Sequence, residues 1–415
     1  MKKICSDMTY LFHNEFYSQY KSAICEFEQY RNNVLPLCAA ENIISEFSKH
    51  PLLYGLQERY ILDGYLNYDE STNMIGSQKL LPFYEIINLQ CKKLFGSIYA
   101  DCRSLSGMNA LQNILLALVN QGDTILIQSS ESGGHVALPN ILRKLNINYI
   151  EAPYNYETID YDYDKINCIL EKENIDFILF APTDILFFPD FKKFKVPLST
   201  TVIFDASQIL AFYINSQENN PLSINNKVIL MGGTHKTIPG VAKALIMTNN
   251  QDLANKIDST INPLYLRNTH MHNVASLILT LIEMQCYAKS YCSNMSENSN
   301  YLGKKLSQYG LDVINCNGVF SKTHQIFFHM EKNLNIFYHM ANKFGISLNK
   351  KNKKLFKGFG VRLGVQEITR YGWDKEELDI IAKILFLLYE NKTKEIPNLL
   401  GLLESKKQVQ YTFEE

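Results

Sequence analysis

The chain has 415 residues, of which 46% are hydrophobic and 20% charged, so it is long enough for two or three domains with an ample core. Its 41 basic and 42 acidic residues leave a formal net charge of -1, which favours neither nucleic acid nor an anionic membrane as a partner. Residues Met1–Tyr10 are mostly polar, and the apolar runs are too short to span a bilayer, so we expect a cytoplasmic enzyme. The nine cysteines include no C-x-x-C pair, so we expect no metal site.

The first 80 residues read as helix followed by loop. Ser18–Tyr30 is amphipathic, and Val34–Asn42 leads into a short helix. Tyr54–Ser77 is dense in Tyr, Asp, Asn and Gly and has no clear period. We expect a long ordered loop there, which in an enzyme is usually functional.

From about Pro82 to Leu264 the pattern alternates between helix and strand. The expected helices are Pro82–Phe95, Gly107–Val119, Val136–Leu145 and Asp164–Glu173. The expected strands are Thr124–Gln128, Asn148–Glu151, Asp176–Ala181, Thr201–Asp205, Val228–Met231 and Ala244–Thr248. Short apolar runs separated by helices predict a mostly parallel sheet that is covered on both faces. Ligands of such sheets bind at the carboxyl ends of the strands.

A long helix, His272–Leu306, then leads to a smaller α+β unit. Its expected strands are Leu311–Asn315, Gln325–Met330 and Gly360–Gly364, and its expected helix is Lys375–Glu390. We therefore divide the chain into an N-terminal arm and loop (1–80), a large domain (81–270) and a linker helix with a small domain (271–415). The basic cluster Lys350–Lys354 is interpreted as a solvated loop rather than a phosphate or nucleic-acid patch.

Two segments suggest a chemistry. An apolar run leads into Met231–Thr237 (MGGTHKT), which carries Lys236, and an earlier apolar run ends at Asp205. A pyridoxal 5′-phosphate (PLP) enzyme needs a lysine that forms a Schiff base with the aldehyde and a carboxylate that keeps the pyridine nitrogen protonated. Ser106-Gly107 opens an apolar helix whose free N–H groups suit a phosphate, although a plain N-cap serine is the alternative.

Seven motifs in order strengthen this hypothesis. They are A-E-N at 40–42, L-F-G at 94–96, S-G at 106–107, G-G-H at 133–135, D-x-S at 205–207, T-H-K-T at 234–237 and R-L-G at 362–364. From about Leu35 to Trp373 the chain resembles serine hydroxymethyltransferase and its relatives, the PLP-dependent threonine aldolases and transaldolases. The resemblance implies an α/β protein of PLP fold type I (aspartate-aminotransferase-like). Such a protein has a large domain with a mixed, mostly parallel sheet and a smaller α+β C-terminal domain.

The resemblance also implies roles for individual residues. Lys236 corresponds to the Schiff-base lysine and Asp205 to the partner of the pyridine nitrogen. Thr183 corresponds to the serine that hydrogen-bonds the phenolic oxygen of the cofactor, and Arg362 to the arginine that holds the substrate carboxylate. The phosphate-binding turn corresponds to Ser106, Gly107 and Met108. We further assign Ser132, Gln208 and His235 to the cofactor, and Tyr60 and Glu41 to the substrate.

Several family positions are changed. Ser132 replaces the ring-stacking histidine, Gln208 replaces a second histidine, and Ala40 replaces a serine near the substrate carboxylate. Asp63 stands where the family has its acid–base glutamate, and Asn73–Ser77 replaces a tyrosine-rich segment. These changes concentrate where the family handles tetrahydrofolate, so we expect a folate-independent enzyme.

The leading hypothesis is an enzyme of specialised metabolism that cleaves or forms the Cα–Cβ bond of a β-hydroxy amino acid such as threonine or serine. It would act as an aldolase, a transaldolase with an aldehyde acceptor, or a hydroxymethyltransferase. The candidate catalytic bases are Asp63, Tyr65 and His135. The alternatives are a transaminase, decarboxylase or racemase acting at Cα, and a binding module, against which the intact Lys236 and Asp205 argue. We expect a homodimer in which Tyr54–Ser77 reaches the partner's cofactor.

Overall fold

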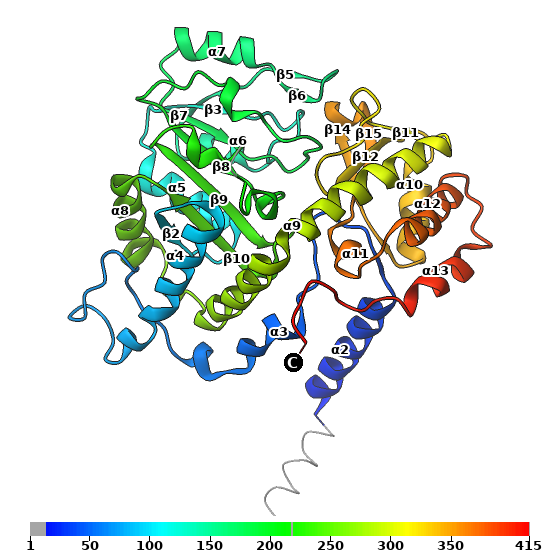
Figure 1. Cartoon of the computed structure of the whole chain (residues 1–415), viewed down its shortest axis with the longest axis horizontal. Helices are drawn as coiled ribbons and strands as arrows, with labels where there is room; N and C mark the ends of the chain where they lie inside the picture. Colours follow the sequence, from blue (N-terminus) through cyan, green and yellow to red (C-terminus); the bar gives the residue numbers. More distant parts are fainter. Residues whose placement is uncertain (1–13, 217–218, 415) are drawn as a thin grey trace, which may run out of the picture.

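The computed structural model describes residues 14–216 and 219–414, which are built around two main β-sheets (Figure 1). The larger sheet has the strand order β2-β10-β9-β8-β7-β3-β4. Its strands are β2 (Tyr99–Asp101), β3 (Thr124–Ile127), β4 (Asn148–Glu151), β7 (Phe177–Phe180), β8 (Thr201–Asp205), β9 (Val228–His235) and β10 (Pro239–Thr248). Strands β4, β3, β7, β8 and β9 are parallel, and β10 is antiparallel to both β9 and β2. The predicted mostly parallel sheet is confirmed.

Both faces of the large sheet are buried, because successive side chains on a strand point to opposite sides. In β8, Val202 and Phe204 join one hydrophobic cluster, whereas Ile203 joins another on the opposite face. The helices of this domain are α4 (Leu81–Phe95), α5 (Gly107–Leu118), α6 (Leu138–Lys144), α7 (Tyr163–Lys172) and α8 (Gln251–Thr260). Helices on both faces explain why the strands read as nearly continuous apolar runs.

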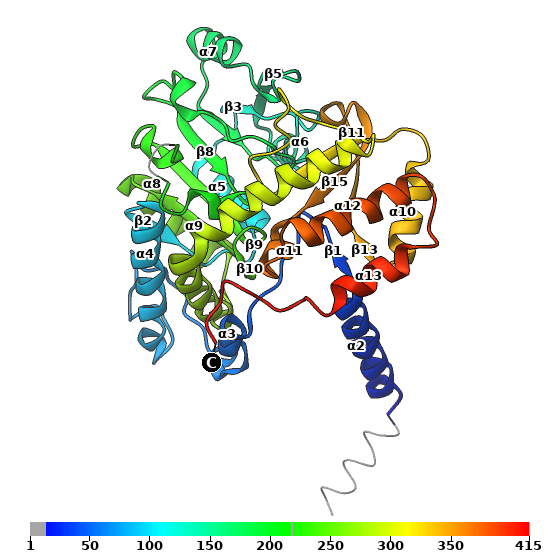
Figure 2. The same cartoon turned by 45° about the vertical axis from the view of Figure 1, so that its right-hand side comes forward.

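The smaller sheet is antiparallel, with the order β11-β12-β15-β14. Its strands are β11 (Asp312–Val313), β12 (Gln325–His329), β14 (Asn349–Lys353) and β15 (Gly358–Gly364). Around it lie α10 (Leu334–Lys343), α11 (Gln366–Arg370), α12 (Lys375–Tyr389) and α13 (Ile396–Glu404). The 38-residue helix α9 (Met271–Gln308) runs from the large sheet to the small one, as Figures 1 and 2 show. The division at 80 and 270 stays a prediction, with which both sheets are compatible.

The N-terminal part holds few regular elements. They are α2 (Glu15–Asn33), β1 (Leu35–Pro36), which pairs with β13 (Ile346–Ser347), and α3 (Glu46–Lys49). Helix α2 points away from the rest of the structure and buries none of its residues (Figure 2). Two further strands, β5 (Tyr154–Asn155) and β6 (Asp160–Tyr161), form a small hairpin. Single 3₁₀ turns lie at His50–Leu53, Gly55–Glu58, Ser77–Lys79, Phe191–Lys193, Leu210–Tyr213, Pro221–Ser223 and Lys354–Phe356, and a π turn at Ile261–Tyr265.

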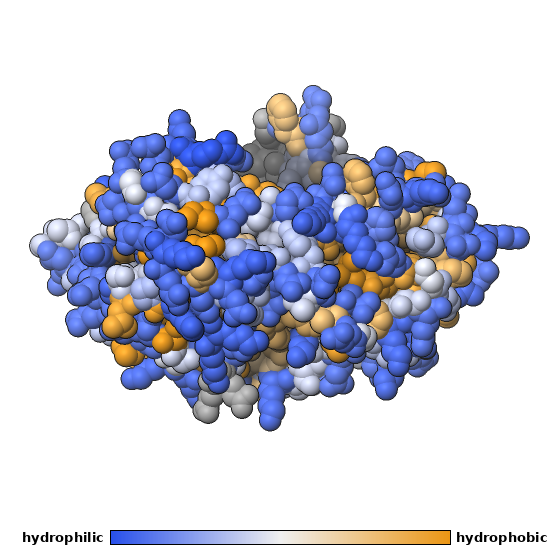
Figure 3. All heavy atoms as spheres, turned by 90° about the horizontal axis from the view of Figure 1, so that it is seen from above, coloured by the Kyte–Doolittle hydropathy of each residue, from blue (hydrophilic) through white to orange (hydrophobic). Residues whose placement is uncertain are grey.

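In the part of the chain that the structure describes, no helix combines the length and the apolar character needed to cross a bilayer. The face seen from above is mostly hydrophilic, with scattered hydrophobic residues (Figure 3). Within the same residues, no group of His, Cys, Asp and Glu side chains is arranged to hold a metal ion.

The interpretation of Lys350–Lys354 as a solvated loop is wrong. The segment forms most of strand β14, which pairs with β15 along its whole length. Alternate side chains of a strand face opposite ways, so Lys351 and Lys353 turn inward, and Lys353 is buried. Five polar or charged residues in a row resemble a loop in sequence, and only the partner strand reveals the alternation.

Candidate active site

The candidate site lies at the carboxyl ends of the parallel strands, as the sheet rule predicts. Thr183 follows β7, Asp205 ends β8 and Lys236 follows β9 directly. From the small domain, β15 contributes Arg362, which donates through Nη1 to the carbonyl oxygen of Thr183 at 2.7 Å. The two domains therefore meet at these residues.

Asp205 is held by the serine two residues later. Its Oδ1 accepts from the backbone N–H of Ser207 at 2.9 Å and from Ser207 Oγ at 2.5 Å. Ser207 Oγ in turn accepts from the backbone N–H of Gly233 at 2.8 Å. The other oxygen, Oδ2, accepts no hydrogen bond from any residue that the structure describes. This geometry leaves one carboxylate oxygen available for a ligand cation such as a protonated pyridine nitrogen.

The N-terminus of α5 lies beside this network. Ser106 caps the helix by accepting from the backbone N–H of Asn109 at 3.2 Å. The N–H groups of Gly107 and Met108 precede the first intrahelical bond and have no acceptor among the described residues. A Cβ on Gly107 would lie 2.8 Å from Ser207 Oγ and 3.3 Å from the nitrogen of Gly233, so only glycine allows this close approach. Ser106 is therefore both a cap and part of a potential anion site.

Lys236 is nearly enclosed. Asn42 Nδ2 donates to its carbonyl oxygen at 2.5 Å and to Tyr291 Oη at 2.9 Å. With the side-chain oxygen of Gln208 turned toward it, Lys236 Nζ donates to that oxygen at 3.2 Å, while the Gln208 nitrogen donates to the carbonyl of Ala39 at 3.1 Å. Burial lowers the pKa of Lys236, although Asp205 opposes that shift. The lowered pKa favours the neutral, nucleophilic amine.

Two histidines flank the lysine. His135 Nδ1 accepts from the backbone N–H of Ala137 at 3.2 Å, so the proton of the neutral ring lies on Nε2. Burial lowers the pKa of His135, against the opposing effect of Asp205. Burial and the neighbouring Lys236 lower the pKa of His235 to about 4, and its Nδ1 is buried without a partner. Both rings are thus neutral near pH 7, and the buried Nδ1 of His235 has no hydrogen-bond partner among the described residues.

Arg362 is almost fully engaged. Its Nε and Nη2 both donate to Asn349 Oδ1, at 3.2 and 2.8 Å, and its Nη1 donates to Asp184 Oδ1 at 3.0 Å. The two donors that meet at Asn349 form the edge with which a guanidinium binds a carboxylate. A substrate carboxylate would replace the Asn349 oxygen there.

The structure also shows where the remaining predicted residues lie. Ser132 is buried in its own turn, where Oγ donates to the carbonyl of Ser129 at 3.1 Å. Thr183 Oγ1 donates to the carbonyl of Gly133 at 3.0 Å. Glu41 is exposed and accepts from Ser347 Oγ at 3.2 Å. None of these three side chains forms a hydrogen bond or ion pair with Lys236 within the described residues, and their ligand roles stay predictions.

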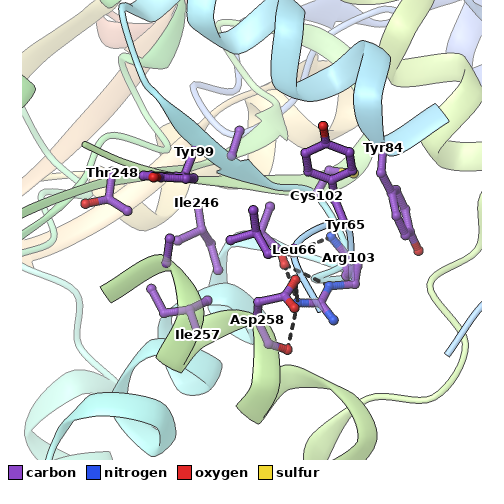
Figure 4. Close-up of a pocket in the computed structure, with 13 residues that line it drawn as sticks. Tyr65, Leu66, Tyr84, Tyr99, Cys102, Arg103, Ile246, Thr248, Ile257 and Asp258 are labelled. Carbon is purple, nitrogen blue, oxygen red and sulfur yellow. Dashed lines mark hydrogen bonds and ion pairs between the residues drawn. The ribbon is translucent and has the colours of Figure 1, made fainter. Parts of the chain in front are cut away.

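The loop residues are not brought to Lys236 within one chain. Asp63 Oδ2 accepts from the backbone N–H of Asp69, Thr72 Oγ1 and Asn73 Nδ2, at 3.0, 3.0 and 2.7 Å. Tyr65 lines a pocket between β2 and α8, together with residues such as Arg103 and Asp258 (Figure 4). Tyr60 is exposed. Their predicted roles depend on a second subunit.

Sequence reasoning missed several residues of the site. Asn42 lies within the A-E-N motif that was recognised, but its contact with the Lys236 carbonyl was not foreseen. Asp184, next to Thr183, is fully buried and binds Arg362 together with Lys351 and Lys353. His324 is buried beside Ala39, and burial lowers its pKa to about 3. Only the position of Asp184 shortly after the end of β7, next to Thr183, was a usable signal.

These donors and acceptors fit PLP. The free N–H groups of α5 and the orphaned His235 Nδ1 suit a phosphate and its oxygen neighbours, and the free oxygen of Asp205 suits a pyridinium. Lys236 supplies the amine for the aldehyde. The set comes from three separate segments of the large domain.

Comparison with known proteins decides the family. The family model of serine hydroxymethyltransferase matches residues 18–385. The chain belongs to the serine hydroxymethyltransferase family. The curated serine hydroxymethyltransferase of Sulfolobus acidocaldarius is 29% identical over 405 residues, which cover 92% of this chain and 91% of that protein. That of Picrophilus torridus is 28% identical over 376 residues, covering 87% and 85%.

A solved structure supports the fold. The L-threonine transaldolase of Pseudomonas fluorescens superposes with a TM-score of 0.89, covering 100% of this chain and 96% of that one, at 22% sequence identity. The predicted family, fold type I architecture and PLP cofactor are confirmed. As a member of the serine hydroxymethyltransferase family, the chain is a PLP-dependent enzyme that cleaves or forms a Cα–Cβ bond of an amino acid.

Proposed function

We propose that this enzyme is a folate-independent transaldolase. It removes the side chain of a β-hydroxy amino acid such as L-threonine as an aldehyde, and it joins the glycyl fragment to a second aldehyde. The neighbour named L-threonine transaldolase supports this reading.

The observation that carries the proposal concerns Asp63. This residue stands where the family has its acid–base glutamate, and three donors from its own loop occupy its Oδ2. A shorter acid that is bound in this way is poorly suited to the proton transfers of a folate reaction. The altered loop thus favours chemistry in which the acceptor is a free aldehyde.

The chain's own residues account for the other requirements. When bound, PLP supplies an electrophilic aldehyde and a ring that accepts the electrons of the broken bond. Arg362 orients the substrate by its carboxylate, through the edge that Asn349 occupies here. His135 presents Nε2–H and is neutral near pH 7, so it is suited to donate a hydrogen bond to the oxygen on Cβ. Gln208 holds the amine of Lys236 without titrating near neutrality.

We also propose a homodimer with shared active sites. Helix α2 exposes Phe16, Tyr20 and Phe27, which a second subunit would cover. A partner would also bring the Tyr54–Ser77 loop near a second Lys236. Sedimentation analysis tests the assembly, and a monomer at micromolar concentration would contradict it.

The test of function uses purified protein loaded with PLP. We expect release of acetaldehyde from L-threonine and, with added benzaldehyde, formation of a new aromatic β-hydroxy amino acid without tetrahydrofolate. Lys236→Ala should abolish both products, whereas Lys350→Ala, on the exposed face of β14, should retain them. Strict dependence on tetrahydrofolate would refute the proposal. Formation of a keto acid without any aldehyde would instead favour transamination.

A further inference from the structure

The basic strand β14 sends alternate side chains to two different environments. Lys350 points outward and donates to Asn335 Oδ1 at 2.6 Å. Lys351 and Lys353 point inward, and their Nζ atoms lie 2.9 and 2.6 Å from the two carboxylate oxygens of Asp184. The period of two residues along a strand explains this separation.

Asp184 has three cationic partners. Arg362 Nη1 lies 3.0 Å from the same oxygen that Lys351 approaches, and the Asp184 side chain has no exposed surface. Burial would raise the pKa of Asp184, but Arg362, Lys353 and Lys351 outweigh burial and lower it to about 2. A single carboxylate therefore faces three positive charges. A substrate carboxylate on Arg362 would balance one more of them and leave one unmatched.

The unmatched charge is best assigned to Lys351. An ammonium group has three N–H donors, and Lys351 Nζ uses one of them, toward Asp184, among the described residues. Lys353 also donates to the carbonyl oxygen of Gly134 at 3.4 Å. The Lys351 side chain is 17% exposed, twice the 8% of Lys353, so it is the one that a ligand can reach. Burial, followed by the charges of Arg362 and Lys353, lowers the pKa of Lys351, which an anionic ligand would reverse.

The cluster belongs to the same neighbourhood as the reaction centre. Arg362 links it directly to the carbonyl of Thr183. His135 lies within the electrostatic reach of Asp205 and Lys236 on one side and of Lys353 and Asp184 on the other. An anion bound at Lys351 would thus lie close to Arg362, since both cations contact the same oxygen of Asp184.

We propose that Lys351, supported by Lys353, selects substrates that carry an anionic group on the side chain beyond Cβ. This inference rests on the proposed transaldolase reaction, in which the aldehyde carbon becomes Cβ of the product. The anionic group therefore enters as a carboxylate or phosphate on the acceptor aldehyde. It occupies the same place in the resulting β-hydroxy amino acid.

Equilibrium binding tests the recognition without requiring turnover. Calorimetric titration of the PLP-loaded protein compares L-aspartate with L-asparagine, and L-glutamate with L-glutamine, which differ in charge but little in size. One or two charge-assisted hydrogen bonds make us expect at least one acid to bind about tenfold to hundredfold more tightly than its amide. Lys351→Met should remove this preference, Lys351→Arg should restore most of it, and Lys350→Met should leave it intact. Equal affinity of both acids and their amides for the wild-type protein would overturn the proposal, even if no variant folds.

Kinetics with paired aldehydes separates this inference from the proposed function. With L-threonine as donor, we expect glycolaldehyde phosphate to exceed glycolaldehyde, or 4-carboxybenzaldehyde to exceed benzaldehyde, by about tenfold in kcat/KM. Lys351→Met should lower kcat/KM for the anionic aldehyde alone, and an equal loss for both members of a pair would overturn the proposal. If no aldehyde reacts while the binding preference for the acids persists, the transaldolase assignment fails and the anion site stands.

Discussion

Asp184→Asn is the sharpest test of the charge arrangement at the domain interface. The substitution keeps the shape of the side chain but removes the one negative charge among Lys351, Lys353 and Arg362, whose nitrogens lie 2.6 to 3.0 Å from it. Breaking a buried ion pair by removing one partner costs about 3–5 kcal/mol. The lowered pKa gives a smaller figure, since a shift from 3.8 to about 2 corresponds to about 2.5 kcal/mol. We expect a loss near 3 kcal/mol, because the amide keeps part of the hydrogen bonding.

The pH dependence has a definite sign. The pKa of Asp184 is lower in the folded state than in the unfolded state, so the stability it contributes is present above pH 4 and is lost as the pH falls through about 2. Urea unfolding of both proteins, followed from pH 7 to pH 3, should show a constant difference down to about pH 5. About half of the difference should be gone at pH 3.

Two further variants make this prediction refutable. Asp312→Asn breaks an exposed pair with Lys357 and should cost little at any pH. Asp184→Asn should be less harmful in a Lys351→Met background, because one of the cations left unpaired has been removed. A cost under about 1 kcal/mol at pH 7, or a difference that persists unchanged at pH 3, would refute the interpretation of a buried cation cluster.

Two predictions concern the reaction centre. Ser207→Ala leaves the buried N–H of Gly233 without an acceptor and removes a hydrogen bond from Asp205. PLP should therefore bind about tenfold more weakly, as measured by absorbance titration. The control Ser259→Ala, at an exposed position of α8, should leave the affinity for PLP unchanged. His135→Gln should abolish the fall in kcat/KM on the acidic side. In the wild type this fall should occur below pH 6.5, because burial lowers the pKa of His135 and protonation of its Nδ1 breaks the bond from the Ala137 N–H. An unchanged acidic limb would show that another group controls the activity there.

The large domain was predictable because its strands are buried on both faces. Thr201–Asp205 was expected as a strand with these bounds, and every residue in it is buried. The short edge strand Tyr99–Asp101 was missed, since three residues of mixed polarity carry no period. Strand Asn349–Lys353 was missed for a related reason, because its inward lysines are stabilised by Asp184 from a distant part of the chain.

The residues of the site also fall into those that the sequence could predict and those that it could not. Lys236 and Asp205 could be inferred because their order and their places at strand ends are properties of the sequence. The role of Gly107 depends on how closely α5 approaches Ser207, which no local pattern encodes. Asp184 was missed because its three partners lie in strands of the other domain, more than 160 residues away along the chain.

Some groups of the site keep the motifs of the family and others do not. The groups that suit the cofactor, namely the α5 N-terminus, Asp205 and Lys236, keep the motifs of the family and interlock through Ser207. Ser132 and Gln208 are changed near the cofactor. Of the groups outside the cofactor set, Asp63 is engaged in its own loop, and Lys351 offers unused donors beside Arg362. Since bond cleavage depends on the first set and selection of the reacting molecule on the second, we propose that the same Cα–Cβ chemistry is directed to a different acceptor. A carbon–carbon bond reaction with an anionic aldehyde satisfies both sets at once.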